Sequence, residues 1–168
     1  MVLAFDVYYK DNGIKAVGVV FEWRGEYPLE IIVERLNNVE EYISGEFYKR
    51  ELPCILKVLK NVNLNEIDTI IIDGYVYVNN NKDYGLGGKL SDELNNSVPI
   101  IGVAKTSFYD NQDTVVKIKR GKSNNPLYIS SIGIDLEQAA LLVQNMNGDH
   151  RLPGILKILD RISKDNKD

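Results

Sequence analysis

The order of the apolar segments places the strongest constraint on how this chain can fold. Three strand-like runs open it, at Val2 to Tyr9, Gly13 to Arg24 and Pro28 to Glu34, and turn-forming residues such as KDNG separate them. Consecutive strands joined by short turns predict an antiparallel meander. Two later runs, one ending at Asp73 and one spanning Val98 to Ala104, are separated by a helical segment, which predicts crossover connections between parallel strands.

Helical periodicity predicts the segments between and after these strands. A first helix has an apolar stripe around Pro53, where a kink is expected, and a short helix is expected from about Gly85 to Leu94. A third helix begins at Asp135, where Gln138 completes a capping-box pattern. The apolar face of the last helix consists of Leu152, Ile155, Leu156, Leu159 and Ile162. The combined pattern predicts an α/β fold of the ribonuclease H-like type: a mixed sheet, with an antiparallel meander and then parallel strands, flanked by helices.

Length and composition bound the class of protein. We expect residues 1–168 to form a single domain. The composition, with 44% hydrophobic and 26% charged residues, is typical of a globular chain. The apolar runs are too short to span a membrane, and the amino terminus lacks the features of a signal peptide, so we expect a cytoplasmic protein without a membrane partner. Cys54 and His150 are each the only residue of their type, which excludes a disulfide and argues against a zinc site of His and Cys.

The net charge of −4 argues mildly against a protein that binds nucleic acid by electrostatics alone. It leaves room for bound divalent cations, because each ion offsets carboxylate charge where a phosphate must lie.

Asp73 ends the apolar run Ile70 to Ile72 and precedes Gly74. The carboxyl end of a strand is where open α/β sheets usually build a ligand site. Asp before Gly is also ordinary turn chemistry, and this stretch taken alone favours the turn.

Three other acids interrupt apolar segments: Asp6 in the first strand, Glu51 on the first helix and Asp160 on the last. The predicted fold makes the first and fourth strands neighbours, so all four carboxylates could meet at one place. Carboxylates this near to one another stay ionised together only if a cation holds them, and carboxylate oxygens are ligands that Mg²⁺ or Mn²⁺ selects. Two such ions about 4 Å apart would position a water for attack on a phosphodiester.

Each of these acids also has an ordinary structural explanation. Asp6 could face solvent on a half-buried strand, and Glu51 and Asp160 could pair with basic neighbours on their own helices. The candidate partners are Lys49, Arg50, Lys157 and Lys164. Taken singly, each acid fits the structural explanation at least as well as the site.

A series of motifs favours the site. YISGEFYKRELP, IDGYVYVNNNKDYGLGGKL, PIIGVAKT, NPLYIS and RLPGILKILD occur in the order and approximate spacing of the endonuclease V family, which the chain resembles from Asp6 onward. The resemblance implies a ribonuclease H-like fold, Mg²⁺ or Mn²⁺ as cofactor, and cleavage of the second phosphodiester on the 3′ side of hypoxanthine, the base of inosine.

The same resemblance implies roles for individual residues. Asp6, Glu51 in RELP and Asp73 in IDG are similar to the metal-binding catalytic acids of the family. Asp160 falls where members have His or Asp, and Lys105 in GVAK resembles the active-site lysine that contacts the cleaved phosphate.

Further positions resemble the substrate-binding residues. Tyr42 in EYISG is similar to the aromatic wedge that fills the gap left by the extruded base, where stacking recovers part of the extrusion cost. Gly45, Gly74 and Gly102 fall where the family's pocket is made of close backbone. Arg50 could hold a phosphate or orient Glu51, and a helix-surface salt bridge explains it equally well.

The chain departs from the family at several positions. It reads DGYV where members usually read DGHG, Asn79 falls near a usual histidine, and Ser44 replaces a usual proline. The sequence also begins at the first strand, without the helical leader that most members have. These changes bear on substrate choice, loop geometry and turnover before they bear on metal binding.

Two other segments were considered as binding motifs. DYGLGGKL lacks the residues of a phosphate loop and of a dinucleotide fingerprint, so no nucleotide cofactor is expected. A predicted ribbon at Asp113 to Ile129 has a basic stretch, whose cationic residues are Lys117, Lys119, Arg120 and Lys122. Contact with a nucleic-acid backbone and protection of a sheet edge explain this stretch equally well.

The sequence therefore predicts a metal-dependent endonuclease that acts on DNA or RNA containing hypoxanthine. The alternatives are a non-catalytic nucleic-acid-binding module with the same fold, and a related nuclease that recognises nucleic-acid structure. The sequence favours neither DNA nor RNA and fixes no oligomeric state.

Overall fold

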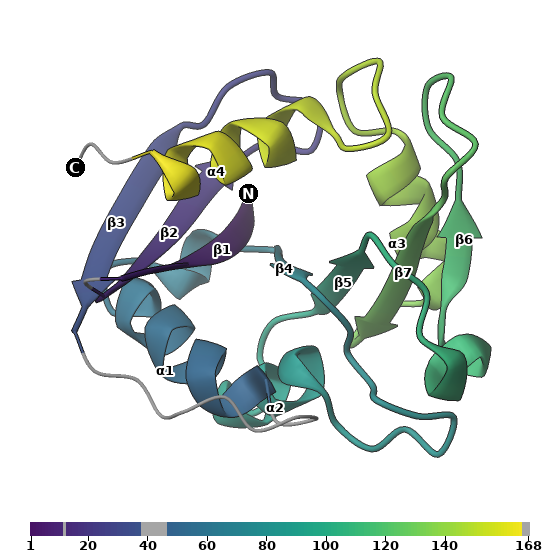
Figure 1. Ribbon diagram of the computed structural model, residues 1–168, viewed down its shortest axis with the longest axis horizontal. Helices are drawn as coiled ribbons and strands as arrows, with labels where there is room; N and C mark the ends of the chain where they lie inside the picture. Colours follow the sequence, from purple (N-terminus) through teal and green to yellow (C-terminus); the bar gives the residue numbers. More distant parts are fainter. Residues whose placement is uncertain (12, 38–46, 166–168) are drawn as a thin grey trace.

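A seven-stranded mixed sheet forms the centre of the computed structural model, which describes residues 1–11, 13–37 and 47–165 (Figure 1). The strands are β1 (Val2–Lys10), β2 (Gly13–Phe21), β3 (Glu30–Leu36), β4 (Thr69–Asp73), β5 (Ile100–Ala104), β6 (Val116–Ile118) and β7 (Leu127–Ile132). The helices are α1 (Phe47–Leu59), α2 (Leu86–Glu93), α3 (Leu136–Gln144) and α4 (Gly154–Lys164), with short 3₁₀ turns η1 (Leu64–Glu66) and η2 (Tyr109–Thr114).

The strand order is β3-β2-β1-β4-β5-β7-β6. Strands β1 to β3 form the predicted antiparallel meander, and β4 and β5 continue the sheet parallel to β1. The predicted mixed sheet is therefore confirmed. The ribbon of β6 and β7 joins the same sheet, with β7 antiparallel to β5, so the parallel strands lie at the centre and antiparallel pairs lie on both sides.

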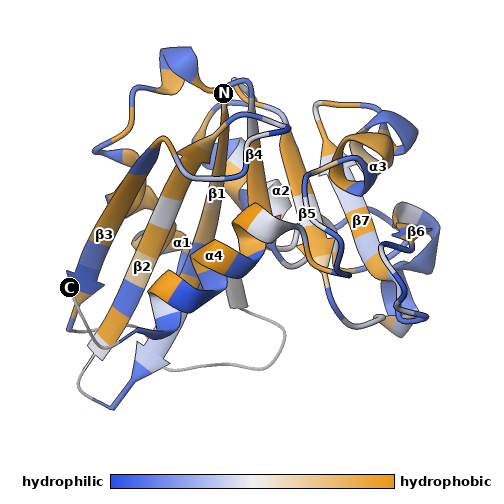
Figure 2. Cartoon of the chain, turned by 90° about the horizontal axis from the view of Figure 1, so that it is seen from above, coloured by the Kyte–Doolittle hydropathy of each residue, from blue (hydrophilic) through white to orange (hydrophobic). Residues whose placement is uncertain are grey.

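Helices cover both faces of the sheet, which explains the almost continuous burial of its central strands (Figure 2). Alternate side chains of β1 point to opposite layers: Val2 and Ala4 pack with α3 and α4, whereas Leu3 and Phe5 pack with α1 and α2. Helix α4 crosses β1 and β2 with its apolar face inward, as its periodicity predicts. The strand acids of the candidate site lie on the face of the sheet that α4 covers.

Local signals explain where several elements begin and end. Asp135 caps α3 and accepts a hydrogen bond from the Gln138 backbone N–H at 3.1 Å, as the capping-box pattern predicts. Helix α1 continues through Pro53 from Phe47 to Leu59. None of the helices in the described part of the chain has both the length and the apolar character needed to cross a membrane.

Arg120 departs from both explanations of the basic stretch. It is only 5% exposed, and its guanidinium donates to the carbonyl oxygens of Gln144, Met146, Gly148, His150 and Arg151. Neither a backbone contact nor edge protection fits a buried side chain, so the prediction was wrong for this residue. Arg120 instead joins the turn between β6 and β7 to the loop between α3 and α4, while Lys117, Lys119 and Lys122 are exposed.

Candidate active site

Two acids lie level with each other on the parallel strands β1 and β4. These strands pair Val2 with Thr69 and Ala4 with Ile71, and the same register continued by two residues places Asp6 beside Asp73. Both acids share the orientation of Ala4 and Ile71, which pack against the layer of α4. Strand β4 ends at Asp73, and Asp6 lies beside it in the middle of β1, so two adjacent parallel strands present two carboxylates to one helix.

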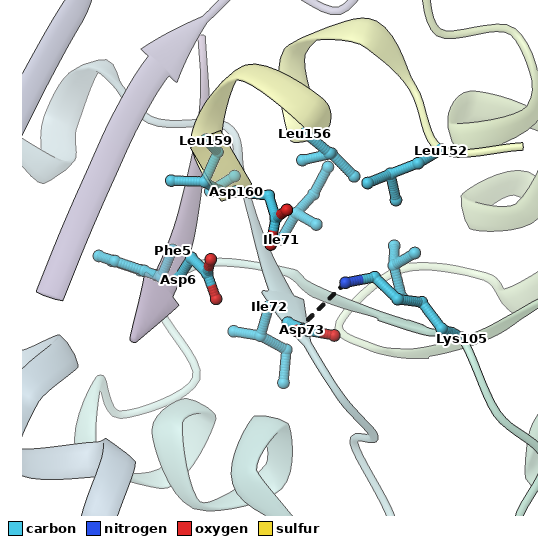
Figure 3. A pocket seen from close by; sticks show the side chains of 12 residues that line it. Phe5, Asp6, Ile71, Ile72, Asp73, Lys105, Leu152, Leu156, Leu159 and Asp160 are labelled. Carbon is cyan, nitrogen blue, oxygen red and sulfur yellow. Dashed lines mark ion pairs between the residues drawn. The ribbon is translucent and has the colours of Figure 1, made fainter. Parts of the chain in front are cut away.

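Helix α4 brings a third acid to the same place. Burial of Ile155, Leu156 and Leu159 orients the helix so that Asp160 points toward the strand ends (Figure 3). Asp6, Asp73, Asp160 and Lys105 line one pocket together. Asp160 also forms an ion pair with Lys164 at 3.0 Å. Asp160 therefore both pairs with a basic neighbour on its own helix and lines the pocket.

Lys105 is the first residue after β5, the strand next to β4. Its Nζ lies 3.9 Å from Oδ2 of Asp73, and the two side chains are only partly exposed, 42% for Lys105 and 53% for Asp73. An exposed ion pair at this separation contributes little to stability. The arrangement therefore leaves a cation at the mouth of the pocket without locking it in place.

Glu51 reaches the acids from the opposite layer. It lies on α1 and lines a second pocket with Asp6 and Asp73. The neighbouring Arg50 places its guanidinium 3.9 Å from the centre of the Tyr9 ring, a cation–π contact. Arg50 therefore packs against β1 next to Glu51. A salt bridge on the helix surface alone does not describe this position.

Burial and mutual repulsion raise the pKa of Asp6, Glu51 and Asp73. Burial raises the pKa of Asp6 to about 6, a hydrogen bond from Ser163 opposes this rise, and repulsion by Asp73 and Asp160 adds to it. Burial, with repulsion by Asp73 and Asp6, raises the pKa of Glu51 to about 7, although Arg50 partly offsets the rise. Burial also raises the pKa of Asp73, against the nearby charge of Lys105.

These carboxylates fit a hard divalent cation in their chemistry. They supply oxygen donors alone, and an added positive charge would relieve the repulsion that raises their pKa values. Within the described ranges, no three acidic, histidine or cysteine side chains already converge as a metal cage. The donor set therefore suits Mg²⁺ or Mn²⁺, and binding would draw the carboxylates closer together.

Two of the predicted glycines fix the turn that follows Asp73. Gly74 has φ +136°, a conformation that side chains rarely adopt. A Cβ on Gly102 of β5 would lie 2.5 Å from the Gly74 carbonyl oxygen and from Ser130 Oγ. The bare backbone at Gly102 therefore lets the turn lie flat against β5. The predicted part of both glycines in a base pocket stays a prediction.

Two predicted substrate contacts, Tyr42 and Gly45, lie outside the described residues. Two of the family departures, Tyr75 and Asn79, have structural roles. The Tyr75 hydroxyl donates to the Thr106 carbonyl, and the Tyr75 ring lies 6.2 Å from that of Phe108, so Tyr75 joins the loops that follow Asp73 and Lys105.

Asn79 organises its own loop. Its side-chain oxygen accepts from the backbone N–H groups of Asn81 and Asp83, and its amide donates to the Asp83 carboxylate at 2.7 Å. Asn79, which falls near a usual family histidine, therefore holds a turn in this chain.

Sequence reasoning missed Ser163, which lies one turn after Asp160 on α4. Its hydroxyl donates to Oδ2 of Asp6 at 2.5 Å. The i, i+3 spacing from Asp160 was the available signal, because residues three apart share a helix face. The contact with Asp6 depends on how α4 packs on β1, which the spacing does not reveal.

Comparison with known proteins is consistent with this arrangement. The fold and its acids define a ribonuclease H-like α/β protein with a carboxylate site at the carboxyl end of β4. The model of the family described as Endonuclease V matches residues 1–161, so the chain belongs to the endonuclease V family, a family of nucleases. No curated protein matches the chain in sequence.

Several solved structures share the fold. Ciona intestinalis endonuclease V in complex with a 23-mer DNA containing an inosine superposes with TM-score 0.80 at 19% identity, covering 97% of this chain and 83% of that one. Human ENDOV gives TM-score 0.77 at 20% identity, with 97% and 82% covered. The Bacillus subtilis endonuclease V gives TM-score 0.72 at 19% identity, with 96% and 77% covered. At these identities the likeness shows the fold, and the family match supplies the membership.

Proposed function

We propose that this protein is a metal-dependent endonuclease that cleaves nucleic acid on the 3′ side of hypoxanthine. The observation that carries the proposal is the meeting of Asp6, Asp73, Asp160 and Lys105 at one pocket. Family membership supports the nuclease activity. The inosine-containing DNA bound by the Ciona relative supports the substrate.

The acids would share the work of holding the ion. Asp6 and Asp73 would bind it from the sheet, Asp160 from α4 and Glu51 from α1. Mg²⁺ or Mn²⁺ would supply a bound water for in-line attack and charge for the leaving oxygen. No histidine base is needed for this chemistry.

The remaining predicted residues would bind the substrate. Lys105 stands free enough at the pocket mouth to turn from Asp73 to a phosphate, because its ion pair is long and exposed. Arg50 would orient Glu51, since it lies against Tyr9 and lowers the pKa of the acid. We keep Tyr42 as the wedge, and Gly45, Gly74 and Gly102 as pocket backbone, within the same proposal. A single domain in the cytoplasm, acting on DNA, RNA or both, completes it.

A non-catalytic nucleic-acid-binding module is the second candidate. The observation in its favour is that the two departures from family histidines have structural contacts: Tyr75 bonds to the loop after Lys105, and Asn79 holds its own loop. If turnover in this fold required an imidazole at either place, the protein would bind its target without cutting it.

Cleavage of end-labelled strands distinguishes these functions. The strands would be single- and double-stranded DNA and RNA, with or without one hypoxanthine, in Mg²⁺ or Mn²⁺. We expect cleavage one nucleotide beyond the lesion, lost in Asp73→Asn and kept in Asp92→Asn, whose exposed acid on α2 is a matched control.

Three other results would contradict the proposal. Binding without cleavage in either ion would support the non-catalytic module. Equal cutting of undamaged and hypoxanthine-bearing strands would point to a nuclease that recognises nucleic-acid structure. Equal loss of cutting in both variants would separate the activity from the acid pocket.

A further inference from the structure

Ser163 on α4 forms a short hydrogen bond with an acid of the sheet, Asp6. The serine is fully buried, and its Oγ lies 2.5 Å from Oδ2 of Asp6 and 2.9 Å from the Asp160 carbonyl oxygen. A hydroxyl carries one proton, and a short bond to an ionised carboxylate is the stronger of the two choices. Ser163 therefore donates to Asp6 whenever that acid is ionised.

Both oxygens of Asp6 are occupied by the protein in this way. The Val7 backbone N–H donates to Oδ1 at 3.0 Å, while Ser163 donates to Oδ2. Two donors at opposite oxygens fix the plane of a carboxylate, and each oxygen keeps a further lone pair for another partner. Asp6 lines the same pocket as Asp73 and Asp160, where these remaining lone pairs would be available to an ion.

The end of α4 that carries Ser163 is itself held in place. Lys15 on β2, only 1% exposed, donates from Nζ to the carbonyl oxygens of Ile162 at 2.7 Å and Asp165 at 2.9 Å. Lys10 on β1 donates to the same Asp165 carbonyl at 2.9 Å. Two cations at the carboxyl end of a helix also complement its dipole. Ser163 is thus a rigid donor whose position both neighbouring strands set.

We propose that Ser163 is a positioning residue for the metal-binding acids: it couples α4 to β1 and holds the Asp6 carboxylate toward the ion site. The inference rests on the proposed function, because it takes Asp6 as a ligand. Groups that orient metal ligands typically contribute 10- to 100-fold to metal affinity. The sequence resemblance assigned no role to this serine.

The test is calorimetric titration of the full-length, metal-free protein with MnCl₂. We expect Ser163→Ala to weaken Mn²⁺ binding roughly 10-fold. The control is Ser91→Ala on α2, because Ser91 is equally buried and donates to Asn96 away from the acids. Its Mn²⁺ affinity should equal that of the native protein, and thermal unfolding of all variants would verify that they fold.

A double-mutant cycle separates positioning from packing. In the Asp6→Asn background Ser163→Ala should have no further effect on the residual affinity, since the partner it orients is gone. An additive effect in that background would overturn the inference. Equal Mn²⁺ affinity of Ser163→Ala and native protein, or equal weakening by Ser91→Ala, would also overturn it. Absence of Mn²⁺ binding by the native protein would instead refute the proposed function, and the inference with it.

Discussion

At the scale of single residues, the site is defined by carboxylates whose charges are costly in the metal-free protein. Asp6, Glu51 and Asp73 each have a pKa above the ordinary value, and burial is the main cause in all three. Ionisation of such groups in the folded state lowers the free energy of unfolding, because the charged form is more favourable in the unfolded chain. Two measurements at this scale test the charges of the pocket.

The first concerns the pH dependence of stability in EDTA. Between pH 4.5 and about 7, the folded protein holds a proton on Glu51 that the unfolded chain has released, so this acid lowers stability as pH rises through that window. We therefore expect Glu51→Gln to match the native protein near pH 4 and to exceed its stability at pH 8 by on the order of 2 kcal/mol. Denaturant unfolding at both pH values measures the difference.

The control for this experiment is Glu93→Gln, which changes an exposed acid at the end of α2. That variant should follow the native protein at both pH values. A Glu51→Gln variant less stable than native at pH 8 would show that the ionised acid is stabilised in the fold, contrary to the pocket described above.

The second measurement concerns Lys105. If the Lys105 side chain contacts the cleaved phosphate, Lys105→Met removes one charged donor at the reacting group. We expect this loss to lower the single-turnover rate roughly 100-fold. Mn²⁺ affinity should change little, because the ion pair with Asp73 is long and exposed. Lys60→Met, at an exposed lysine after α1, is the control, and a rate within a few-fold of native for Lys105→Met would exclude the proposed contact.

At the scale of elements, two adjacent parallel strands and one helix create the site. The register of β1 and β4 sets Asp6 beside Asp73, and the packing of α4 over these strands adds Asp160. The turn after Asp73 must lie against β5, and glycine at position 102 makes this approach geometrically feasible. The position of Asp73 therefore depends on a residue of the neighbouring strand.

Gly102→Ala tests this dependence. The added Cβ would lie 2.5 Å from the Gly74 carbonyl oxygen and from Ser130 Oγ, so the turn must shift. We expect a loss of about 1–3 kcal/mol in the free energy of unfolding, the usual range for overpacking, and weaker Mn²⁺ binding. Gly154→Ala at the start of α4 is the matched control, because its Cβ would have only one neighbour, at 3.5 Å. Native-like Mn²⁺ affinity in Gly102→Ala would show that the turn does not position Asp73.

At the scale of the whole molecule, the fold gathers charged groups from segments that are far apart in the chain. Four carboxylates from β1, α1, β4 and α4 lie at the pocket or beside it. The apolar layers on both faces of the sheet hold these segments against the mutual repulsion of the acids. A divalent ion bound there should therefore stabilise the entire domain.

Thermal unfolding with and without MnCl₂ measures this coupling. A ligand at 100 times its Kd contributes about 2.7 kcal/mol, so the midpoint should rise clearly in the native protein at pH 8. The rise should be smaller at pH 5, where Asp6 and Glu51 are largely protonated, and absent in Asp73→Asn. An equal rise in Asp73→Asn would place the ion elsewhere on the protein.

Local patterns accounted for much of the fold because their causes are local. Residues 70–73, the cap at Asp135 and the apolar stripe of α4 follow from side-chain spacing and from hydrogen bonds within a few residues. Arg120 and Lys15 could not be predicted in this way. Each is a buried cation whose hydrogen bonds are accepted by carbonyl oxygens of distant segments.

The sequence by itself determined the order of strands and helices, the residue types of the site and, through the family motifs, the chemistry expected of them. Only the tertiary structure decided that Ser163 holds Asp6, that Glu51 approaches from the opposite layer and that Tyr75 joins two loops. The reason is physical: periodicity records which side of its own element a residue occupies. Contacts between elements depend on how those elements pack, and packing is a property of the whole chain.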